Sequence, residues 1–362
     1  MSLRPPEAHA LDEWAALLRE RGALAAGAPF PVRPCLSAEG PAPLPDDIGA
    51  YIRGDAVVGL SARRCGLESV PAVTALADLE TLDLDGNPLG RLPEGLERLP
   101  ALRMLSLYGS ALTAVPSVIG DLARLEYLSL GRAPITSLPD EVWDLRSLRT
   151  LIIAETRLRS VPERIAALTQ VETLDLGHNE LTVLPDALGA LPSLTSFLYL
   201  SHNRLTEVPP SLTRLRGLRY LSVTDNRLTA LPESIGDMGG LVELRLYGNE
   251  LGTLPDAIGA LAALQELHAS GNGMTRLPGT IGRLRALTHL DLRNNALTAL
   301  PLEVRDLGNL AFLDLRANRL TQVPATIDAL PRLRKLDLRW NKLDAPRAWR
   351  EEMARRGCTV YF

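Results

Sequence analysis

Residues 171–185 read VETLDLGHNELTVLP, and this stretch decides the fold. Its central leucines, Leu174 and Leu176, are two residues apart, so they point the same way from an extended strand. Asp175, between them, points the opposite way. The Gly-His-Asn turn that follows places a polar side chain where it can hydrogen-bond the bending backbone. One such segment has a single apolar face and nothing to bury it against, so it cannot fold alone.

The chain solves this problem by repeating the segment. Residues 79–93 read LETLDLDGNPLGRLP, and residues 287–301 read LTHLDLRNNALTALP. A proline closes each copy, at Pro71, Pro93, Pro116, Pro139, Pro162, Pro185, Pro209, Pro232, Pro255, Pro278, Pro301 and Pro324. Successive prolines are 22, 23 or 24 residues apart, and 23 is the usual spacing. A fixed period in this range is typical of a solenoid, in which each repeat contacts its neighbours.

The pattern L-x-x-L-x-L-x-x-N-x-L with a closing Leu-Pro resembles the leucine-rich repeat family, specifically its intracellular class. The resemblance covers about residues 57–343, in thirteen copies. It implies an α/β fold: a curved, horseshoe-shaped solenoid with a parallel β-sheet on the concave face and short 3₁₀ or α turns on the convex face. It says little about function, because such repeats bind many kinds of partner.

The segments outside the repeats are predicted to cover the two ends of the solenoid. We assign residues 1–44 to an N-terminal helical cap and connector, and expect a helix over 7–25 with Leu11, Trp14 and Leu18 on one side. A partner-binding amphipathic helix is the alternative for that segment.

The solenoid itself is assigned to residues 45–344, with 44–52 interpreted as the return half of a first repeat. Residues 345–362 form the C-terminal cap, with a helix over 346–356 ended by Gly357 and an edge strand over 358–362.

One asparagine per repeat is expected to form a buried column that hydrogen-bonds open backbone groups. The column comprises Asn87, Asn179, Asn203, Asn226, Asn249, Asn272, Asn295, Asn318 and Asn341, with Cys65 in the first repeat. Ser110, Ala133 and Thr156 interrupt it in three successive repeats. Because Ala133 cannot hydrogen-bond and Pro134 lacks an N–H, we expect an irregular turn there, marking either tolerated drift or a binding feature.

The single 24-residue interval places an extra residue just before a strand, near Phe197, in the segment SLTSFLYL of residues 193–200. A one-residue insertion at this place predicts a β-bulge, and bulges re-aim side chains.

Composition restricts the classes of function. The net charge of −4 and isoelectric point near 5.8 argue against a nucleic-acid surface, which is normally basic. The three cysteines, Cys35, Cys65 and Cys358, are widely separated and predict reduced thiols rather than a disulfide-linked cap. No apolar run reaches the length of a membrane span, and no secretory segment precedes the repeats. We therefore expect a cytoplasmic monomer, and the richness in Ala, Arg, Gly and Pro suggests a bacterial origin.

Three variable positions per repeat flank the two strand leucines and face the concave side. Most of the few aromatic residues occupy them, although a solenoid core does not need them there, and tyrosine is enriched at protein interfaces. We predict a partner-binding surface comprising Phe197, Tyr199, Tyr220, Tyr247, Arg245, His268, Tyr127 and Tyr108. The alternative is aromatic packing across strands that only stiffens the sheet.

A grid of charges occupies the same surface near the C-terminal end. Asp291, Asp314 and Asp337 share one column, and Arg293, Arg316 and Arg339 share the next. Each aspartate has an arginine two residues along the same face, which predicts a self-neutralising surface. A strip that binds a charged partner is the alternative.

Motifs for catalysis, cofactors and metals are not found in the sequence. His178, His202 and Asp225 hold one turn position in three successive repeats, and this ligand set can bind a metal. They are strung along a line, however, so we interpret them as solvated turn residues and expect no metal, no cofactor and no catalytic residue.

The resulting functional hypothesis is a non-enzymatic scaffold that binds a protein partner, of unknown identity, on its concave face. Three alternatives stay open: a bacterial effector delivered to a host cell, a structural or self-assembling protein, and an enzyme with an unrecognised site.

Overall fold

The computed structural model forms two compact units, Met1–Asn179 and Glu180–Phe362. It describes residues 3–35, 48–323, 325–343 and 347–362. The division of the chain at 44/45 and 344/345 stays a proposal, because both boundaries lie outside the described residues.

Unit 1 begins with helix α1 (Pro5–Glu20), whose apolar side is fully buried at Trp14 and Leu18. The helix starts two residues before the predicted bound, because proline is tolerated in a first helical turn. It ends five residues before the predicted bound, since Gly22 adopts φ +71°, a conformation that stops a helix.

The entry into the repeats differs from the prediction. Strand β2 (Ile48–Arg53) pairs antiparallel with β3 (Ala56–Ala62), and β1 (Val32–Pro34) pairs parallel with β2. The interpretation of 44–52 as the return half of a repeat is therefore wrong over 48–52, and residues 44–47 lie outside the described residues. Apolar residues alternate along β2, as expected for one strand of a hairpin. The same residues also fit the repeat pattern, which led to the wrong interpretation.

The repeat strands are three residues long and follow one another in parallel within each unit. In unit 1 they are β4 (Thr81–Asp83), β5 (Met104–Ser106), β6 (Tyr127–Ser129), β7 (Thr150–Ile152) and β8 (Thr173–Asp175). In unit 2 they are β9 (Phe197–Tyr199), β10 (Tyr220–Ser222), β11 (Glu243–Arg245), β12 (Glu266–His268), β13 (His289–Asp291), β14 (Phe312–Asp314) and β15 (Lys335–Asp337).

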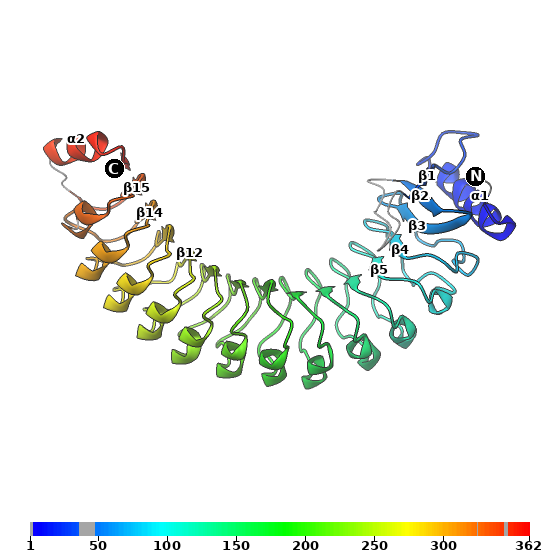
Figure 1. The fold of residues 1–362 in the computed structure, drawn as a ribbon, viewed down its shortest axis with the longest axis horizontal. Helices are drawn as coiled ribbons and strands as arrows, with labels where there is room; N and C mark the ends of the chain where they lie inside the picture. The colour runs from blue at the N-terminus through cyan, green and yellow to red at the C-terminus, as the bar shows by residue number, and fades with distance from the viewer. Residues whose placement is uncertain (1–2, 36–47, 324, 344–346) are drawn as a thin grey trace. The chain divides into compact units, whose positions relative to one another are not determined.

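Short 3₁₀ helices form the return segments, and in each unit Figure 1 shows them on the outer side of the curve, opposite the strands. Unit 1 has η1 (Leu96–Arg98), η2 (Ser117–Asp121), η3 (Asp140–Asp144) and η4 (Glu163–Ala167). Unit 2 has η5 (Asp186–Ala190), η6 (Pro210–Arg214), η7 (Glu233–Asp237), η8 (Asp256–Ala260), η9 (Gly279–Arg283), η10 (Leu302–Asp306) and η11 (Ala325–Ala329). The closing proline is the residue just before each of η2 to η10, at φ between −78° and −63°, so its fixed φ starts the turn. The predicted parallel sheet and 3₁₀ turns are confirmed.

The asparagine column is confirmed as a hydrogen-bonded ladder. Asn226 is typical: its Nδ2 donates to the carbonyls of Leu200 and Val223 at 3.0 and 3.1 Å. Its Oδ1 accepts from the N–H of Leu205 at 2.9 Å. Each asparagine thus joins its own turn to the preceding one and satisfies backbone groups that are buried between the leucines.

The interruption of the ladder changes the hydrogen bonds but not the turn. Arg132 keeps the φ of +54° found at the same place in other repeats, so the expected irregular turn at Ala133 is wrong. The N–H of Ile135 instead donates to the Ala133 carbonyl at 2.7 Å, and the buried Ser110 Oγ has no hydrogen-bond partner among the described residues. Only Thr156 joins the ladder, through Asn179.

Unit 2 ends with helix α2 (Arg347–Arg355) and strand β16 (Thr359–Tyr361), which pairs parallel with β15. Both elements were predicted within a few residues. Among the helices that the structure describes, none combines the length and the apolar character that a bilayer crossing requires.

Candidate functional site

The strand face of unit 2 presents three columns of side chains: the first residue of each strand, the third, and the residue two beyond. The second residue of each strand points into the core, and Leu221 and Leu244 are accordingly at most 1% exposed. Pairing is residue for residue from β9 to β15, so that Tyr220 lies between Phe197 and Glu243. Residues that share a column are therefore direct neighbours.

Three aromatic side chains form one cluster on this face, at β9 and β10. The ring centre of Tyr199 lies 4.9 Å from that of Tyr220 and 6.0 Å from that of Phe197. The ring centres of Phe197 and Tyr220 are 5.5 Å apart. The Arg245 guanidinium lies 5.5 Å from the centre of the Tyr220 ring. Phe197 is still 44% exposed, which leaves an aromatic ring open to solvent at the first strand of unit 2. We call Phe197, Tyr199 and Tyr220 the aromatic cluster.

A hollow of about 340 Å³ adjoins the aromatic cluster, lined by Phe197, Tyr220, Glu243 and Arg219 among others. Burial raises the pKa of Tyr220 to about 12. The hollow combines an apolar wall with a carboxylate and a guanidinium.

The extra residue in the 24-residue repeat lies directly before the cluster. Elsewhere two successive N–H groups share one carbonyl, as Val242 and Glu243 share that of Arg219. Here the N–H of Arg219 donates to the carbonyl of Thr195, and the N–H of Tyr220 donates to the carbonyl of Ser196. Two residues, Thr195 and Ser196, therefore take the place of the single accepting residue of the other repeats. This is the arrangement of a bulge, and it confirms the insertion predicted near Phe197.

The other residues of the predicted surface do not join the aromatic cluster. Tyr247 lines a separate hollow of about 320 Å³ with Arg293, Arg316 and Trp340. Tyr108 and Tyr127 belong to unit 1. The hydroxyl of Tyr108 donates to Glu155, and this bond, with burial, raises the pKa of Tyr108 to about 12.

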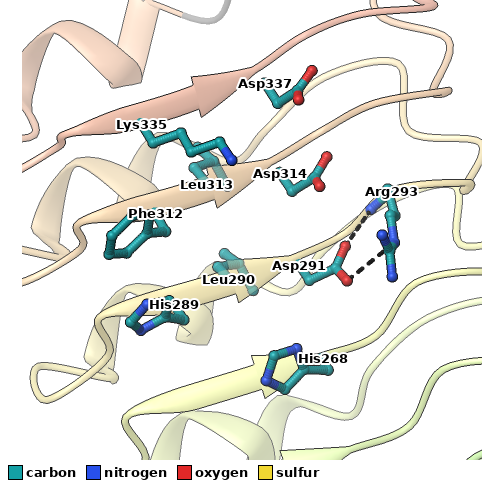
Figure 2. Close-up of a pocket in the computed structure, with 10 residues that line it drawn as sticks. All are labelled: His268, His289, Leu290, Asp291, Arg293, Phe312, Leu313, Asp314, Lys335 and Asp337. Carbon is teal, nitrogen blue, oxygen red and sulfur yellow. Dashed lines mark hydrogen bonds and ion pairs between the residues drawn. The ribbon is translucent and has the colours of Figure 1, made fainter. Parts of the chain in front are cut away.

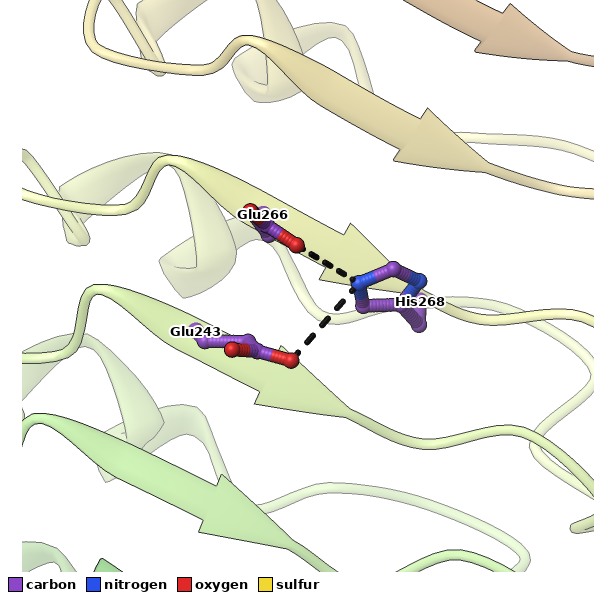
Figure 3. A group of neighbouring side chains, drawn as sticks. All are labelled: Glu243, Glu266 and His268. Atoms are coloured by element: carbon purple, nitrogen blue, oxygen red, sulfur yellow. Dashed lines mark hydrogen bonds and ion pairs between the residues drawn. The ribbon is translucent and has the colours of Figure 1, made fainter.

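His268 belongs to a group of three potential ligands with Glu243 and Glu266, shown in Figure 3. Its Nε2 lies 3.2 Å from Oε2 of Glu266 and 3.8 Å from Oε1 of Glu243. The sequence predicts His268 as a site residue, but not the two glutamates. Their spacing of 23 residues in the first column is the signal that they are neighbours.

A third hollow, of about 300 Å³, lies over β12 to β15 (Figure 2). Phe312 stacks on His289 with ring centres 4.4 Å apart, at the side opposite Asp291 and Asp314 in the view. Lys335 reaches across from the next strand, so the hollow has an aromatic side and an acidic side.

The charge grid neutralises itself, as the in-line pairing predicted. Arg293 contacts Asp291 at 3.3 Å, Arg316 contacts Asp314 at 2.6 Å, and Arg339 contacts Asp337 at 2.7 Å. Burial raises the pKa of the Asp291 carboxyl. At Asp337 burial also acts upward, but hydrogen bonds from the Arg339 side chain and backbone outweigh it and lower the pKa.

The histidine row that sequence analysis considered as ligands consists of turn residues. His178, His202 and Asp225 all have φ between +52° and +54°, which is the left-handed position that each turn requires. His202 Nε2 contacts Asp225 Oδ2 at 3.2 Å, and His178 belongs to the other unit.

Comparisons of sequence agree with the fold. A family described as "Leucine-rich repeat region" matches residues 116–216, "Leucine rich repeat" matches 196–251, 216–274 and 285–343, and "Leucine Rich Repeat" matches 78–99. No curated protein matches the chain.

Solved structures include similar solenoids. A leucine-rich repeat protein of Leptospira interrogans is 33% identical over 84% of this chain and 83% of its own, with a TM-score of 0.71. An internalin of Listeria monocytogenes is 20% identical over 85% and 89%, with a TM-score of 0.70. The FLRT2 repeat region, solved with latrophilin 3 and Unc5D, is 24% identical over 75% and 86%, with a TM-score of 0.62.

Proposed function

The chain belongs to the leucine-rich repeat family, and we propose that it is a non-enzymatic scaffold that binds a protein partner on the strand face of unit 2. Repeats of this family generally mediate interactions between proteins, and FLRT2 is an example in which the repeat region is part of a complex. The partner's identity is not part of the proposal.

The observation that carries the proposal is the aromatic cluster with its exposed Phe197 ring. Phe197, Tyr199 and Tyr220 contact one another on two short, hydrogen-bonded strands, so their side chains lose little freedom when a partner covers them. Tyrosine and arginine are also among the residue types that contribute most of the binding energy at interfaces. The exposed Phe197 ring adds apolar surface that a partner can cover. Arg245 and the adjoining hollow complete a patch with both apolar and charged groups.

The alternative role for the aromatic residues, stiffening of the sheet, fits Tyr199 and Tyr220 but not Phe197. A ring that only joins strands is expected to be covered by its neighbours, whereas Phe197 is 44% exposed. We keep Tyr247 and His268 as outlying positions of the proposed surface, because they share its columns but not the ring contacts. Tyr108 and Tyr127 lie in unit 1 and stay a separate prediction.

The proposal includes a cytoplasmic monomer of bacterial origin. Cys35, Cys65 and Cys358 are all thiols, which fits a reducing compartment. Light scattering on the purified chain measures its mass, and a stable dimer would favour the self-assembling alternative.

Photo-crosslinking tests the proposed face directly. A photoreactive amino acid is placed at Tyr199, on the strand face, or at Leu302, which is 66% exposed on η10. We expect a specific crosslinked partner from position 199 and none from position 302. A partner captured from position 302 alone would overturn the proposal.

A matched set of variants then measures the contribution of the cluster. The triple variant Phe197→Ser, Tyr199→Ser, Tyr220→Ser is expected to lose the crosslinked partner, with an unchanged circular dichroism spectrum. Val183→Ser with Leu302→Ser removes exposed apolar side chains elsewhere and is expected to retain it. Retention by the folded triple variant would exclude the aromatic cluster as the binding site.

A further inference from the structure

Two glutamates and a histidine converge on the strand face, between the hollow beside the aromatic cluster and the hollow over β12 to β15. Glu243 and Glu266 are the first residues of β11 and β12 and pair directly in register, and His268 is the third residue of β12. In Figure 3 the imidazole faces both carboxylates. One donor atom from each residue lies within 4.8 Å of the others. We propose that Glu243, Glu266 and His268 bind a divalent transition-metal ion, with Zn²⁺ as the best fit.

Two of the three distances between donor atoms are close to those around a tetrahedral ion. Zn²⁺ binds nitrogen and oxygen at about 2.0–2.2 Å, so two ligands of one tetrahedron lie about 3.3–3.6 Å apart. His268 Nε2 lies 3.2 Å from Glu266 and 3.8 Å from Glu243. The donor atoms of the two glutamates lie within 4.8 Å of each other, so rotation of these side chains would complete the tetrahedral spacing.

The types of donor select the ion. One imidazole with two carboxylates is a nitrogen and oxygen set that suits Zn²⁺ and its first-row neighbours, whereas Mg²⁺ and Ca²⁺ prefer oxygen alone. Two carboxylates on adjacent strands also repel each other. A divalent cation removes that repulsion more completely than a single positive side chain.

Arg245 is the cation that the metal must displace. Its Nε donates to Oε1 of Glu243, the same oxygen that faces His268. The Arg245 guanidinium also lies 5.5 Å from the centre of the Tyr220 ring, where it has a second favourable contact. Metal binding would leave Arg245 on Tyr220, and removing the arginine would favour the metal.

Three protein ligands leave a fourth position open, and His289 is the nearest candidate to fill it. Its Nδ1 lies 3.9 Å from Oε1 of Glu266, but it already contacts the Thr288 hydroxyl at 2.9 Å, and its ring is stacked on Phe312. We therefore assign the fourth position to water, and the site does not depend on the proposed protein partner.

Titration of the full chain with Zn²⁺ in a calorimeter, in a buffer that does not chelate, tests the site. We expect one ion per chain. Co²⁺ in its place should give the intense visible absorption of a tetrahedral site. His268→Gln and Glu266→Gln are each expected to weaken binding by at least about tenfold. The proposal would be overturned if the parent chain did not bind Zn²⁺, or if both variants bound it as tightly as the parent chain does.

Two further variants separate this site from general surface binding. His202→Gln removes a histidine that is paired with a carboxylate elsewhere in unit 2, and it should leave Zn²⁺ affinity unchanged. Arg245→Gln should tighten binding, because it removes the competing cation from Glu243. A loss of affinity in either variant contradicts the assigned ligand set, and circular dichroism confirms that each variant is folded.

Discussion

The ring of Tyr199, the third residue of β9, lies 4.9 Å from the ring of Tyr220, the first residue of β10. The two residues are diagonal neighbours, because Tyr220 pairs directly with Phe197. The contact therefore joins two repeats through side chains on the strand face, in addition to the leucines beneath it.

This contact should appear as an energetic coupling. Tyr199→Ala and Tyr220→Ala, alone and together, are expected to show a coupling of about 0.5–1.5 kcal/mol in urea unfolding, as found for aromatic pairs. Tyr220→Ala with Phe312→Ala provides the control, since these residues lie four strands apart and their effects should add. Additive effects for Tyr199 and Tyr220 would mean that the ring contact does not contribute to stability.

The asparagine ladder should make a large contribution at each step. Asn226→Ala removes the acceptor of the Leu205 N–H and the donor to the Leu200 and Val223 carbonyls. Leaving these buried groups without partners is expected to cost about 1–3 kcal/mol of unfolding free energy. Thermal and urea unfolding measure the loss, and a change within experimental error would show that water replaces the amide.

The reverse substitution should stabilise the chain. Ala133 is buried at the ladder position, and its side chain offers no hydrogen bond. Ala133→Asn restores the missing amide and is expected to add about 1 kcal/mol to the unfolding free energy. A decrease in the urea midpoint would instead show that the position is too tightly packed, or that Pro134 prevents the ladder geometry.

The hydrogen bond from Tyr108 to Glu155 predicts a loss of stability at high pH. It raises the pKa of Tyr108 to about 12, above the ordinary value of about 10 in the unfolded chain. The neutral phenol is therefore favoured by folding, and its contribution is fully present below about pH 10 and lost as the pH rises to about 12. Titration of the phenolate absorbance measures this directly.

Glu155→Gln provides the matched variant for that titration. It removes the charge that opposes ionisation of Tyr108, so one phenol should titrate at lower pH than in the parent chain. Tyr108→Phe should remove that phenol altogether. An unchanged titration in Glu155→Gln would contradict the hydrogen bond.

The buried Asp337 carboxylate predicts a loss of stability in acid. Its pKa is lowered by the hydrogen bonds from Arg339, at 3.0 and 2.7 Å, so folding favours the charged form. This contribution is present above the ordinary pKa of about 3.9 and lost as the pH falls through the lower value in the folded chain. Arg339→Gln should therefore lower the unfolding free energy at neutral pH and lower it less in acid.

Urea unfolding at neutral and acidic pH separates this effect from a general loss of packing. Arg293→Gln is the control, because its partner Asp291 has a raised pKa and gains less from the charge. A deficit in Arg339→Gln that is the same at both pH values would contradict the assigned role of Asp337.

The repeat pattern was sufficient to predict most of the fold. The period of 23 residues predicts which leucines are buried and which asparagines line up, because each repeat can bury its apolar face only against another repeat. The pattern failed where the period stops. Residues 48–52 have apolar residues at positions compatible with the repeat template, but they pair antiparallel with β3, and pairing direction cannot be read from spacing alone.

The sequence predicts which residues of the candidate site share a column on the strand face, but not which of their side chains touch. The repeat register identifies Tyr220 and Glu243 as neighbours, and the pairing of Asp314 with Arg316 follows from their separation by two residues. Whether Tyr199 turns toward Tyr220 rather than along its own column depends on side-chain rotamers. For the same reason the sequence did not separate Tyr247 from the aromatic cluster.

The gap in the ladder at Ser110 and Ala133 has a mechanical consequence. Each repeat is held by its two neighbours, so a stretched solenoid behaves as a row of springs in series. Such a row extends first at its softest member, and the missing amides soften the coils around Ala133. Under a pulling force, those coils are therefore expected to part before the coils that carry a complete set of asparagine bonds.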